Sequence, residues 1–172
     1  DGDLNYLSQQ QGGSISFDAC IVELDVFAAT DELTFEYVFG SEEYPEFVGT
    51  GFNDIFAFFV SGPGIVGDPN LSNNAKNIAI VPGTTNTPVQ INSVNNDINW
   101  QFYRNNELGE SLEYDGLTSD ELGIKKSLTA RTDVIPCNTY HLKLAVADRA
   151  DGIYDSGVFI SDIQGGTPNL AV

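Results

Sequence analysis

The sequence predicts an all-β fold: a two-layer antiparallel β-sandwich with long calcium-binding loops and at most one short helix. Short segments in which apolar and polar residues alternate recur along the chain, with Gly, Pro, Asn and Asp between them. This is the pattern of half-buried strands joined by turns, and no segment longer than about ten residues keeps a helical 3.6-residue period. The 172 residues are 41% hydrophobic and 11% aromatic, a composition typical of a folded domain. We therefore expect a single domain over residues 1–172, excised from something larger.

The phase of the alternation places the strands. Residues 15–19 and 22–26 alternate in opposite phase, so one strand that carries both needs a bulge near Ile21. Residues 33–39 form the next alternating run, and the segment 54–60 is apolar on both faces, as expected of a central strand covered on two sides. The one expected helix is short, near Ser119–Gly123. Further strands are expected at Asn77–Val81, Pro88–Val94, Asn99–Arg104, Ser127–Val134, Thr139–Ala147 and Gly157–Ile163.

Cys20 and Cys137 are the only cysteines, and both lie beside expected strands. A bridge between them would close a long loop and contribute on the order of 4 kcal/mol in the chain-entropy model. We predict that they form a disulfide, since the context looks extracellular. The alternative is two separate buried thiols.

The charge balance restricts the partners. The chain has 25 acidic and 7 basic residues and a net charge of −18. Nucleic acid and anionic membrane surfaces both require clustered Lys and Arg, so we expect neither nucleic-acid binding nor direct membrane binding. Carboxylates beside backbone carbonyls suit hard divalent cations, which makes Ca²⁺ the expected cofactor.

Three acidic loops are candidate calcium ligands. The first follows the strand that ends at Phe39, the second opens the central strand, and the third joins the last two long strands around Gly152. Any one Asp in such a loop has an ordinary role in turn formation, but three loops that gather at one end of a sheet favour a cation. That gathering assumes that 35–39 and 55–60 pair as a long-looped hairpin. The candidate ligands are Glu42, Glu43, Asn53, Asp54, Asp148, Asp151 and Asp155.

The opening Asp1–Asn5 has the start of an EF-hand loop but lacks its closing Glu, because Gly12 stands in that place.

Catalysis is poorly supported. The chain has no Gly-x-Ser-x-Gly, no His-Glu-x-x-His and no phosphate loop, and the single histidine, His141, alternates with Lys143 on a polar strand face. We expect no enzymatic activity.

Five ordered motifs, spanning roughly Phe17 to Ile160, resemble those of the choice-of-anchor L domain, a family found in large bacterial surface proteins. They are Tyr37–Phe47, Gly51–Gly64, Asn77–Thr84, Tyr140–Asp148 and Tyr154–Ile160. The acidic, Met-free composition is also similar to that of modules in long RTX adhesins, some of which bind peptide C-termini through calcium. The resemblance implies a monomeric module on the bacterial cell surface that acts in cell adhesion and biofilm formation.

By this resemblance, the expected partner is a protein or peptide on another cell surface, bound through its C-terminal carboxylate. An anion can approach so acidic a surface only through a cation with an open coordination position. The expected ligand-contacting residues beside the acidic loops are Tyr44, Phe47, Phe52, Tyr154 and Ser156. Two alternatives are a calcium-dependent lectin for surface glycans, with Trp100, Tyr103 or Tyr154 stacked on the sugar, and a structural spacer that calcium stiffens.

Overall fold

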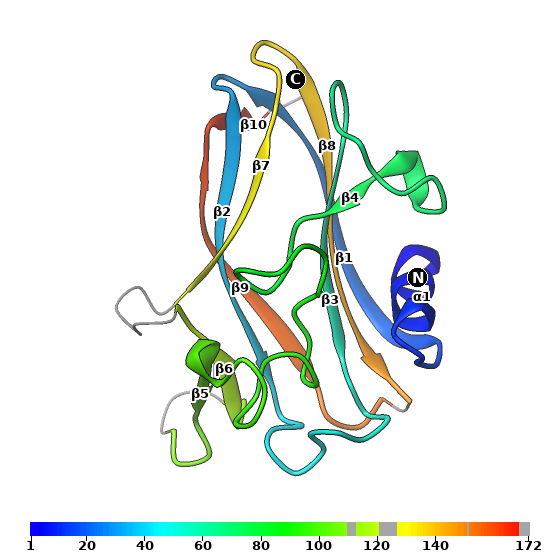
Figure 1. Cartoon of the computed structure of the whole chain (residues 1–172), viewed down its shortest axis with the longest axis vertical. Coiled ribbons are helices and arrows are strands. Elements are labelled where there is room, and N and C mark those ends of the chain that lie inside the picture. The colour runs from blue at the N-terminus through cyan, green and yellow to red at the C-terminus, as the bar shows by residue number, and fades with distance from the viewer. Residues whose placement is uncertain (110–112, 121–126, 151, 169–172) are drawn as a thin grey trace.

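The computed structural model describes residues 1–109, 113–120, 127–150 and 152–168, and it is a sandwich of two antiparallel sheets (Figure 1). In the first sheet the strand order is β10-β1-β8-β3-β4; in the second, β2 pairs with β9 along one edge and with β7 and β6 along the other. The predicted two-layer antiparallel β-sandwich is therefore confirmed, whereas the calcium-binding loops stay a prediction. Within the described residues, no helix is long and apolar enough to cross a membrane. The strands are β1 (Ser16–Ala28), β2 (Glu32–Ser41), β3 (Ile55–Ser61), β4 (Lys76–Asn77), β5 (Tyr103–Asn105), β6 (Gly116–Thr118), β7 (Leu128–Asp133), β8 (Thr139–Arg149), β9 (Ser156–Gln164) and β10 (Gly166–Pro168).

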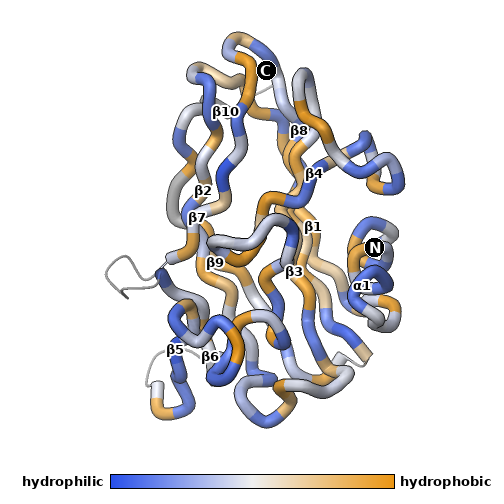
Figure 2. Tube along the Cα trace, in the orientation of Figure 1, coloured by the Kyte–Doolittle hydropathy of each residue, from blue (hydrophilic) through white to orange (hydrophobic). Residues whose placement is uncertain are grey.

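The central strand β3 is buried at all seven positions, as its two apolar faces predicted. One face, with Phe56 and Phe58, joins the main core between the sheets. The other face, with Phe59, packs under helix α1 (Gly2–Gln10) and a covering loop, through Leu4 and Leu71. Figure 2 shows the hydrophobic stretches concentrated on the strands of the two layers. The first sheet is thus covered on both sides where β3 runs.

Strand β1 carries the predicted bulge, although not at the predicted residue. Its register against β8 shifts by one residue between Phe17 and Cys20, and Asp18 has a left-handed φ of 45°. The extra residue is what reverses the phase of the alternation. The bulge lies near the start of the strand and displaces the Asp18 side chain from the regular alternation.

The loops between β3 and β5 differ from the prediction. Pro88–Val94 forms no strand, and only the isolated bridges of Pro88 and Gln90 remain. The reason is that side chains take the backbone hydrogen bonds: the Asn77 Oδ1 accepts from two backbone N–H groups, and the Gln90 N–H donates to the Ser93 Oγ. Two 3₁₀ turns, Ser72–Asn74 and Trp100–Phe102, complete this region.

The described α-helix is α1, where the sequence showed an EF-hand-like opening. The Asp1 carboxylate accepts from the backbone N–H groups of Asp3 and Leu4 and so caps the helix. Asp3 binds Lys143 and Ser72. The helix expected near Ser119–Gly123 lies partly outside the described residues.

The assumed hairpin of residues 35–39 with 55–60 is wrong. β2 and β3 belong to different sheets, and the neighbours of β3 are β8 and β4. The segment between β2 and β3 crosses from one layer to the other at the lower end of the molecule in Figure 1. The end of β2 and the start of β3 therefore still meet at one end of the sandwich.

The predicted disulfide is also wrong, because Cys20 and Cys137 are free thiols. The Cys137 N–H donates to the carbonyl of Ala28, at the opposite end of β1 from Cys20. Eight strand residues separate the two positions by roughly 26 Å, whereas a disulfide requires Cα atoms within about 7 Å. Both thiols are exposed rather than buried.

Candidate functional site

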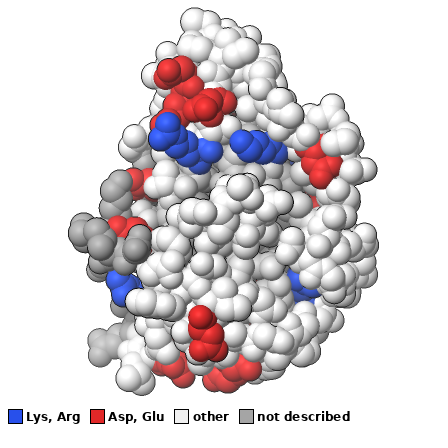
Figure 3. All heavy atoms as spheres, viewed as in Figure 1, with Lys and Arg blue, Asp and Glu red and all other residues white. Residues whose placement is uncertain are grey.

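The acidic end of the sandwich is the region where β2 and β8 end and β3 and β9 begin. Figure 3 shows acidic side chains at this lower end of the molecule, in the orientation of Figure 1. Four separate segments of chain converge there, although each lies beside a different strand. We name the region the acidic end and define it by Asp18, Glu42, Glu43, Asp54, Asp148, Arg149 and Asp155.

Asp54 lies at the centre of the acidic end and is completely buried. One carboxylate oxygen accepts from the Arg149 backbone N–H at 3.0 Å, and the other accepts from the Ser156 Oγ at 2.7 Å. These two bonds connect the start of β3 to the end of β8 and the start of β9. The hydroxyl of Ser156, which the sequence suggested for ligand contact, is therefore engaged within the protein.

Asp148 has a strongly perturbed carboxyl group at the acidic end. Burial raises the pKa of its carboxyl to about 7, and the nearby carboxylates of Asp54, Asp155 and Asp18 act in the same direction. Asp18 reaches this group from the β1 bulge. A Cβ placed on Gly152 would lie 2.6 Å from the Asp18 Oδ2 and 3.9 Å from the Asp148 Oδ2, so the glycine allows the Asp18 carboxylate to come close to the loop beside Asp148.

Arg149 supplies a positive charge inside this cluster. Its side chain is buried, and burial lowers the pKa of the guanidinium while the charges of Asp54 and Glu43 raise it. A Cβ on Gly13 would overlap the guanidinium, so the group packs closely on the chain that follows α1. Glu43 is also buried. The arginine thus compensates part of the negative charge that we expected a bound cation to compensate.

Three other predicted ligands have structural contacts. Glu42 and Asp155 are joined twice: the Glu42 N–H donates to the Asp155 carbonyl at 3.2 Å, and the Asp155 N–H donates to the Glu42 Oε2 at 3.3 Å. The buried Asn53 accepts from the Asn92 backbone N–H at 2.7 Å. Asn53 therefore anchors a neighbouring loop, whereas Glu42 and Asp155 stay with the acidic end.

Three of the four predicted aromatic residues form a cluster beside the acidic end. The ring of Phe47 lies 5.4 Å from the ring of Phe52 and 5.5 Å from the ring of Tyr154, between centroids. Tyr154 is 44% exposed. Tyr44 differs: it is fully buried, packs on Tyr103, and its hydroxyl donates to the Val94 carbonyl at 2.6 Å. Tyr44 belongs to the core and cannot contact a ligand at the surface in this conformation.

The described residues contain no group of three or more His, Cys, Asp or Glu side chains arranged to hold a metal ion. Asp151, one of the predicted ligands, lies outside the described residues. Calcium takes six to eight oxygen ligands, which include backbone carbonyls and water as well as carboxylates. The calcium site at the acidic end therefore stays a prediction.

Sequence reasoning missed Asp18 and Arg149. Asp18 stands at the change of phase in the first strand, and a bulge redirects the residue it displaces; that was the available signal. Arg149 is one of only seven basic residues and stands inside an acidic loop. A buried carboxylate requires a partner of opposite charge. The one arginine in that acidic loop was therefore the available signal for such a partner.

A separate surface cleft lies away from the acidic end. A cleft of about 700 Å³ separates α1 from the loops around residues 66–77 and 85–88. Tyr6 and Asp68 meet in it, with 2.9 Å between the Tyr6 hydroxyl and an Asp68 oxygen, and the Asn70 amide donates to both. The rest of the lining mixes neutral amides, such as Gln10 and Asn86, with apolar side chains, Thr85 and the cationic Lys76.

One comparison with known proteins gives a match. A family model described as the Choice-of-anchor L domain matches residues 1–163. No curated protein and no solved structure matches the chain.

Proposed function

The chain belongs to the choice-of-anchor L domain family, a bacterial surface module, and on this premise we propose that it binds a peptide C-terminus through calcium at the acidic end. The observation that carries the proposal is the convergence of carboxylates from four segments on one end of the sandwich, with a single arginine among them. The charges of Asp54, Asp155 and Asp18 all act on the carboxyl group of Asp148. Their proximity is costly unless a cation or a proton is shared.

A bound cation would explain how an anionic ligand reaches this surface. The chain carries a net charge of −18, so a carboxylate is repelled until a divalent ion stands between it and the protein. The described carboxylates would supply part of a calcium shell, and backbone carbonyls, water and the ligand carboxylate would supply the remainder. Calcium in this role binds and orients the ligand, and no chemical step is involved.

The aromatic cluster of Phe47, Phe52 and Tyr154 supports side-chain selectivity. Its rings lie beside the acidic end and Tyr154 is partly exposed. Small ligand sites commonly combine apolar and aromatic walls with a few polar groups that fix orientation. The ion would anchor the carboxylate while the rings contact the terminal side chain.

The test is affinity selection from a pool of random hexapeptides, synthesised once as free acids and once as amides, with calcium or with chelator. We expect the immobilised protein to retain peptides only from the acid pool and only in calcium. Equal retention of acids and amides would show that binding does not require the peptide carboxylate. Retention in the presence of chelator would show that binding does not require calcium.

A calcium-dependent lectin is the second candidate, and the cleft beside α1 favours it. Neutral amides, a tyrosine, a lysine and one carboxylate line this cleft, and such groups suit sugar hydroxyls. Trp100 is 67% and Tyr154 is 44% exposed, whereas Tyr103 is buried, so only the first two offer a ring for stacking. Retention of soluble glycans but of neither peptide pool would favour the lectin, and retention of no ligand would favour a structural spacer.

A further inference from the structure

The sandwich is open along one side, beside the acidic end. The partners of β1 are β8 along its whole length on one edge and β10 on the other, but β10 covers only Val26–Ala28. Among the described residues, no strand pairs with that second edge from Cys20 to Asp25. Strand β9, on the opposite sheet, pairs only with β2 in the part of the chain that the structure describes. Figure 1 shows β9 running from the lower end beside β2 towards β10. Two unpaired strand edges therefore border the same opening.

The opening exposes side chains that belong to the core face. Val22 shares its face of β1 with Leu24 and Val26, which are packed in the core, yet Val22 is 55% exposed. Ile160 lies opposite the buried Tyr37 in the register of β9 and β2, and it is 39% exposed. The hollow between them has a volume of about 230 Å³ and is lined by Cys20, Val22, Phe56, Leu144, Val146, Val158 and Ile160, with Ser156 and Gly157 at its border. We name it the seam.

We propose that the peptide ligand of the acidic end binds as an added antiparallel strand along the free edge of β1, with alternate side chains in the seam. This inference rests on the proposed function and assigns the residues that precede the bound carboxylate. Strand addition satisfies the unpaired backbone groups of an edge, and the pockets beneath read every second side chain. The edge from Cys20 to Asp25 is about 20 Å long at 3.3 Å per residue.

Strand direction connects the seam to the acidic end. β1 begins at the acidic end, where Ser16 and Phe17 pair with Arg149 and Asp148. A strand antiparallel to β1 therefore has its C-terminus at that end, beside Asp18. β10 already runs antiparallel on the same edge. Ser156 borders the seam and also donates to Asp54, so the two sites are continuous.

Charge defines the chemistry of the added strand. Glu23 and Asp25 are exposed on the outer face of β1, between the residues that face the seam. Cross-strand neighbours share a face, so the bound segment should alternate apolar residues over Val22 and Leu24 with Lys or Arg opposite Glu23 and Asp25. A second copy of this chain is disfavoured, because two such acidic edges would face each other.

The two thiols provide the test. Cys20 lines the seam and Cys137 lies at the far end of β1, and both are exposed. The probe is the peptide acetyl-Lys-Val-Lys-Val-Lys-Val-Lys-Val as a free acid, with three control peptides: its amide, a Glu-for-Lys version, and a version N-methylated on alternate residues. With calcium and saturating acid peptide, we expect alkylation of Cys20 to slow at least tenfold and that of Cys137 to be unchanged.

The controls separate this inference from the proposed function. The N-methylated and Glu-for-Lys peptides should give no protection, and Val22→Glu should abolish protection while Val66→Glu, at a 90% exposed position outside the seam, should not. Absence of Cys20 protection at millimolar peptide, while the acid pool is retained in calcium, refutes the strand site and leaves the carboxylate bridge standing. Equal protection of Cys20 by the acid and the amide peptide would support the strand site but refute the calcium-bridged carboxylate. Cys20 could also be protected in the absence of peptide. If deletion of residues 169–172 abolishes that protection, the chain itself occupies the edge and the proposal is wrong.

Discussion

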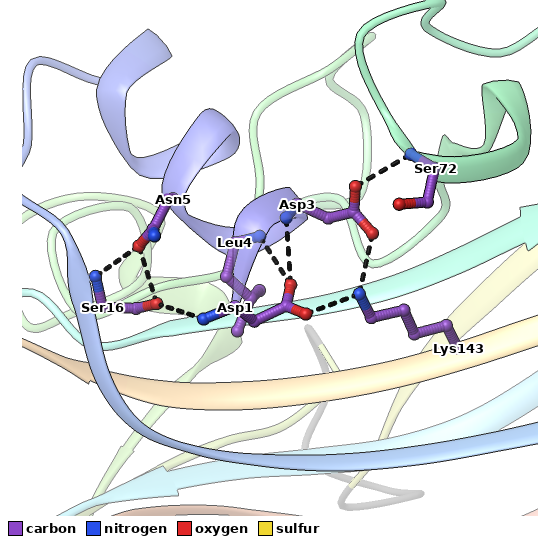
Figure 4. A network of polar contacts seen from close by, with 7 residues as sticks. All are labelled: Asp1, Asp3, Leu4, Asn5, Ser16, Ser72 and Lys143. Carbon is purple, nitrogen blue, oxygen red and sulfur yellow. Dashed lines mark hydrogen bonds and ion pairs between the residues drawn. The ribbon is translucent and has the colours of Figure 1, made fainter.

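Replacing the buried Lys143 with methionine should destabilise the domain far more than the same replacement of the exposed Lys76. Lys143 is on the outer face of β8, under α1, and is only 8% exposed. Its Nζ lies 2.7 Å from an oxygen of Asp1 and 2.7 Å from an oxygen of Asp3 (Figure 4). The same two carboxylates hold the N-terminus of α1 and the Ser72 N–H. The lysine thus joins the helix to the sheet.

The magnitude follows from what the substitution leaves behind. Methionine keeps most of the volume but leaves two nearly buried carboxylates without their cation, and breaking a buried ion pair in this way costs about 3 to 5 kcal/mol. We expect a loss of about 3 kcal/mol in the free energy of unfolding, since Asp1 and Asp3 keep their backbone hydrogen bonds. The matched control is Lys76→Met at an exposed position, which should change stability by less than about 0.5 kcal/mol.

The pH dependence has a defined sign. Burial alone would raise the pKa of Asp3, but the hydrogen bonds from Lys143 and Ser72 outweigh it, and the pKa lies below its ordinary value of 3.8. The ion pair therefore stabilises the fold above about pH 4, and this contribution is lost as the pH falls through the lower pKa of the folded state. The difference between wild type and Lys143→Met should shrink accordingly in acid.

The assay is urea unfolding followed by circular dichroism, at pH 7 and at pH 3. Adding Asp1→Asn and Asp3→Asn to Lys143→Met should recover most of the loss, because neutral groups no longer require the cation and Asn also caps helices. A Lys143→Met variant no less stable than Lys76→Met, or a triple variant as unstable as the single one, would refute this account of the network.

Two further predictions concern the acidic end. Calcium at 100 times its dissociation constant should add about 2.7 kcal/mol per independent site, so excess chelator should lower the melting temperature by several degrees, and an unchanged melt would contradict calcium binding. In chelator, Asp148→Asn should stabilise the protein at pH 8 and not at pH 4. The folded pKa of about 7 lies above the ordinary 3.8, so the stability that this carboxyl contributes when protonated is lost as the pH rises through 7. We expect a gain of about 2 kcal/mol at pH 8 after allowance for solvent screening, measured by urea unfolding; equal stability of wild type and variant at pH 8 would contradict it.

The sequence predicted those parts of the fold that depend on local alternation. The two apolar faces of β3 indicated a strand covered on both sides, and the change of phase in β1 indicated a bulge. β6 and β10, with three residues each, are too short for a period to appear. The segment Pro88–Val94 has a strand-like composition, but side-chain hydrogen bonds such as that of Ser93 replace its backbone pairing.

The acidic end could be predicted in outline because acidic loops follow or precede several strands. Which loop residues are buried could not, since that depends on how the segment between β2 and β3 crosses between the layers. Tyr44 and Phe47 are three residues apart, yet the first lies in the core and the second packs beside the partly exposed Tyr154. The disulfide failed for a related reason: strand pairing alone determines that Cys20 and Cys137 lie at opposite ends of β1.

The most direct test of the central claim, that the acidic end holds calcium, is a calorimetric titration of calcium into three proteins at pH 7.5. These are wild type, the double variant Asp54→Asn/Asp148→Asn, and Asp133→Asn, whose exposed carboxylate lies at the opposite end of the sandwich. We predict saturable calcium binding by wild type and by Asp133→Asn, and its loss in the double variant. Absence of binding by wild type, or equal binding by all three proteins, would contradict a calcium site at the acidic end.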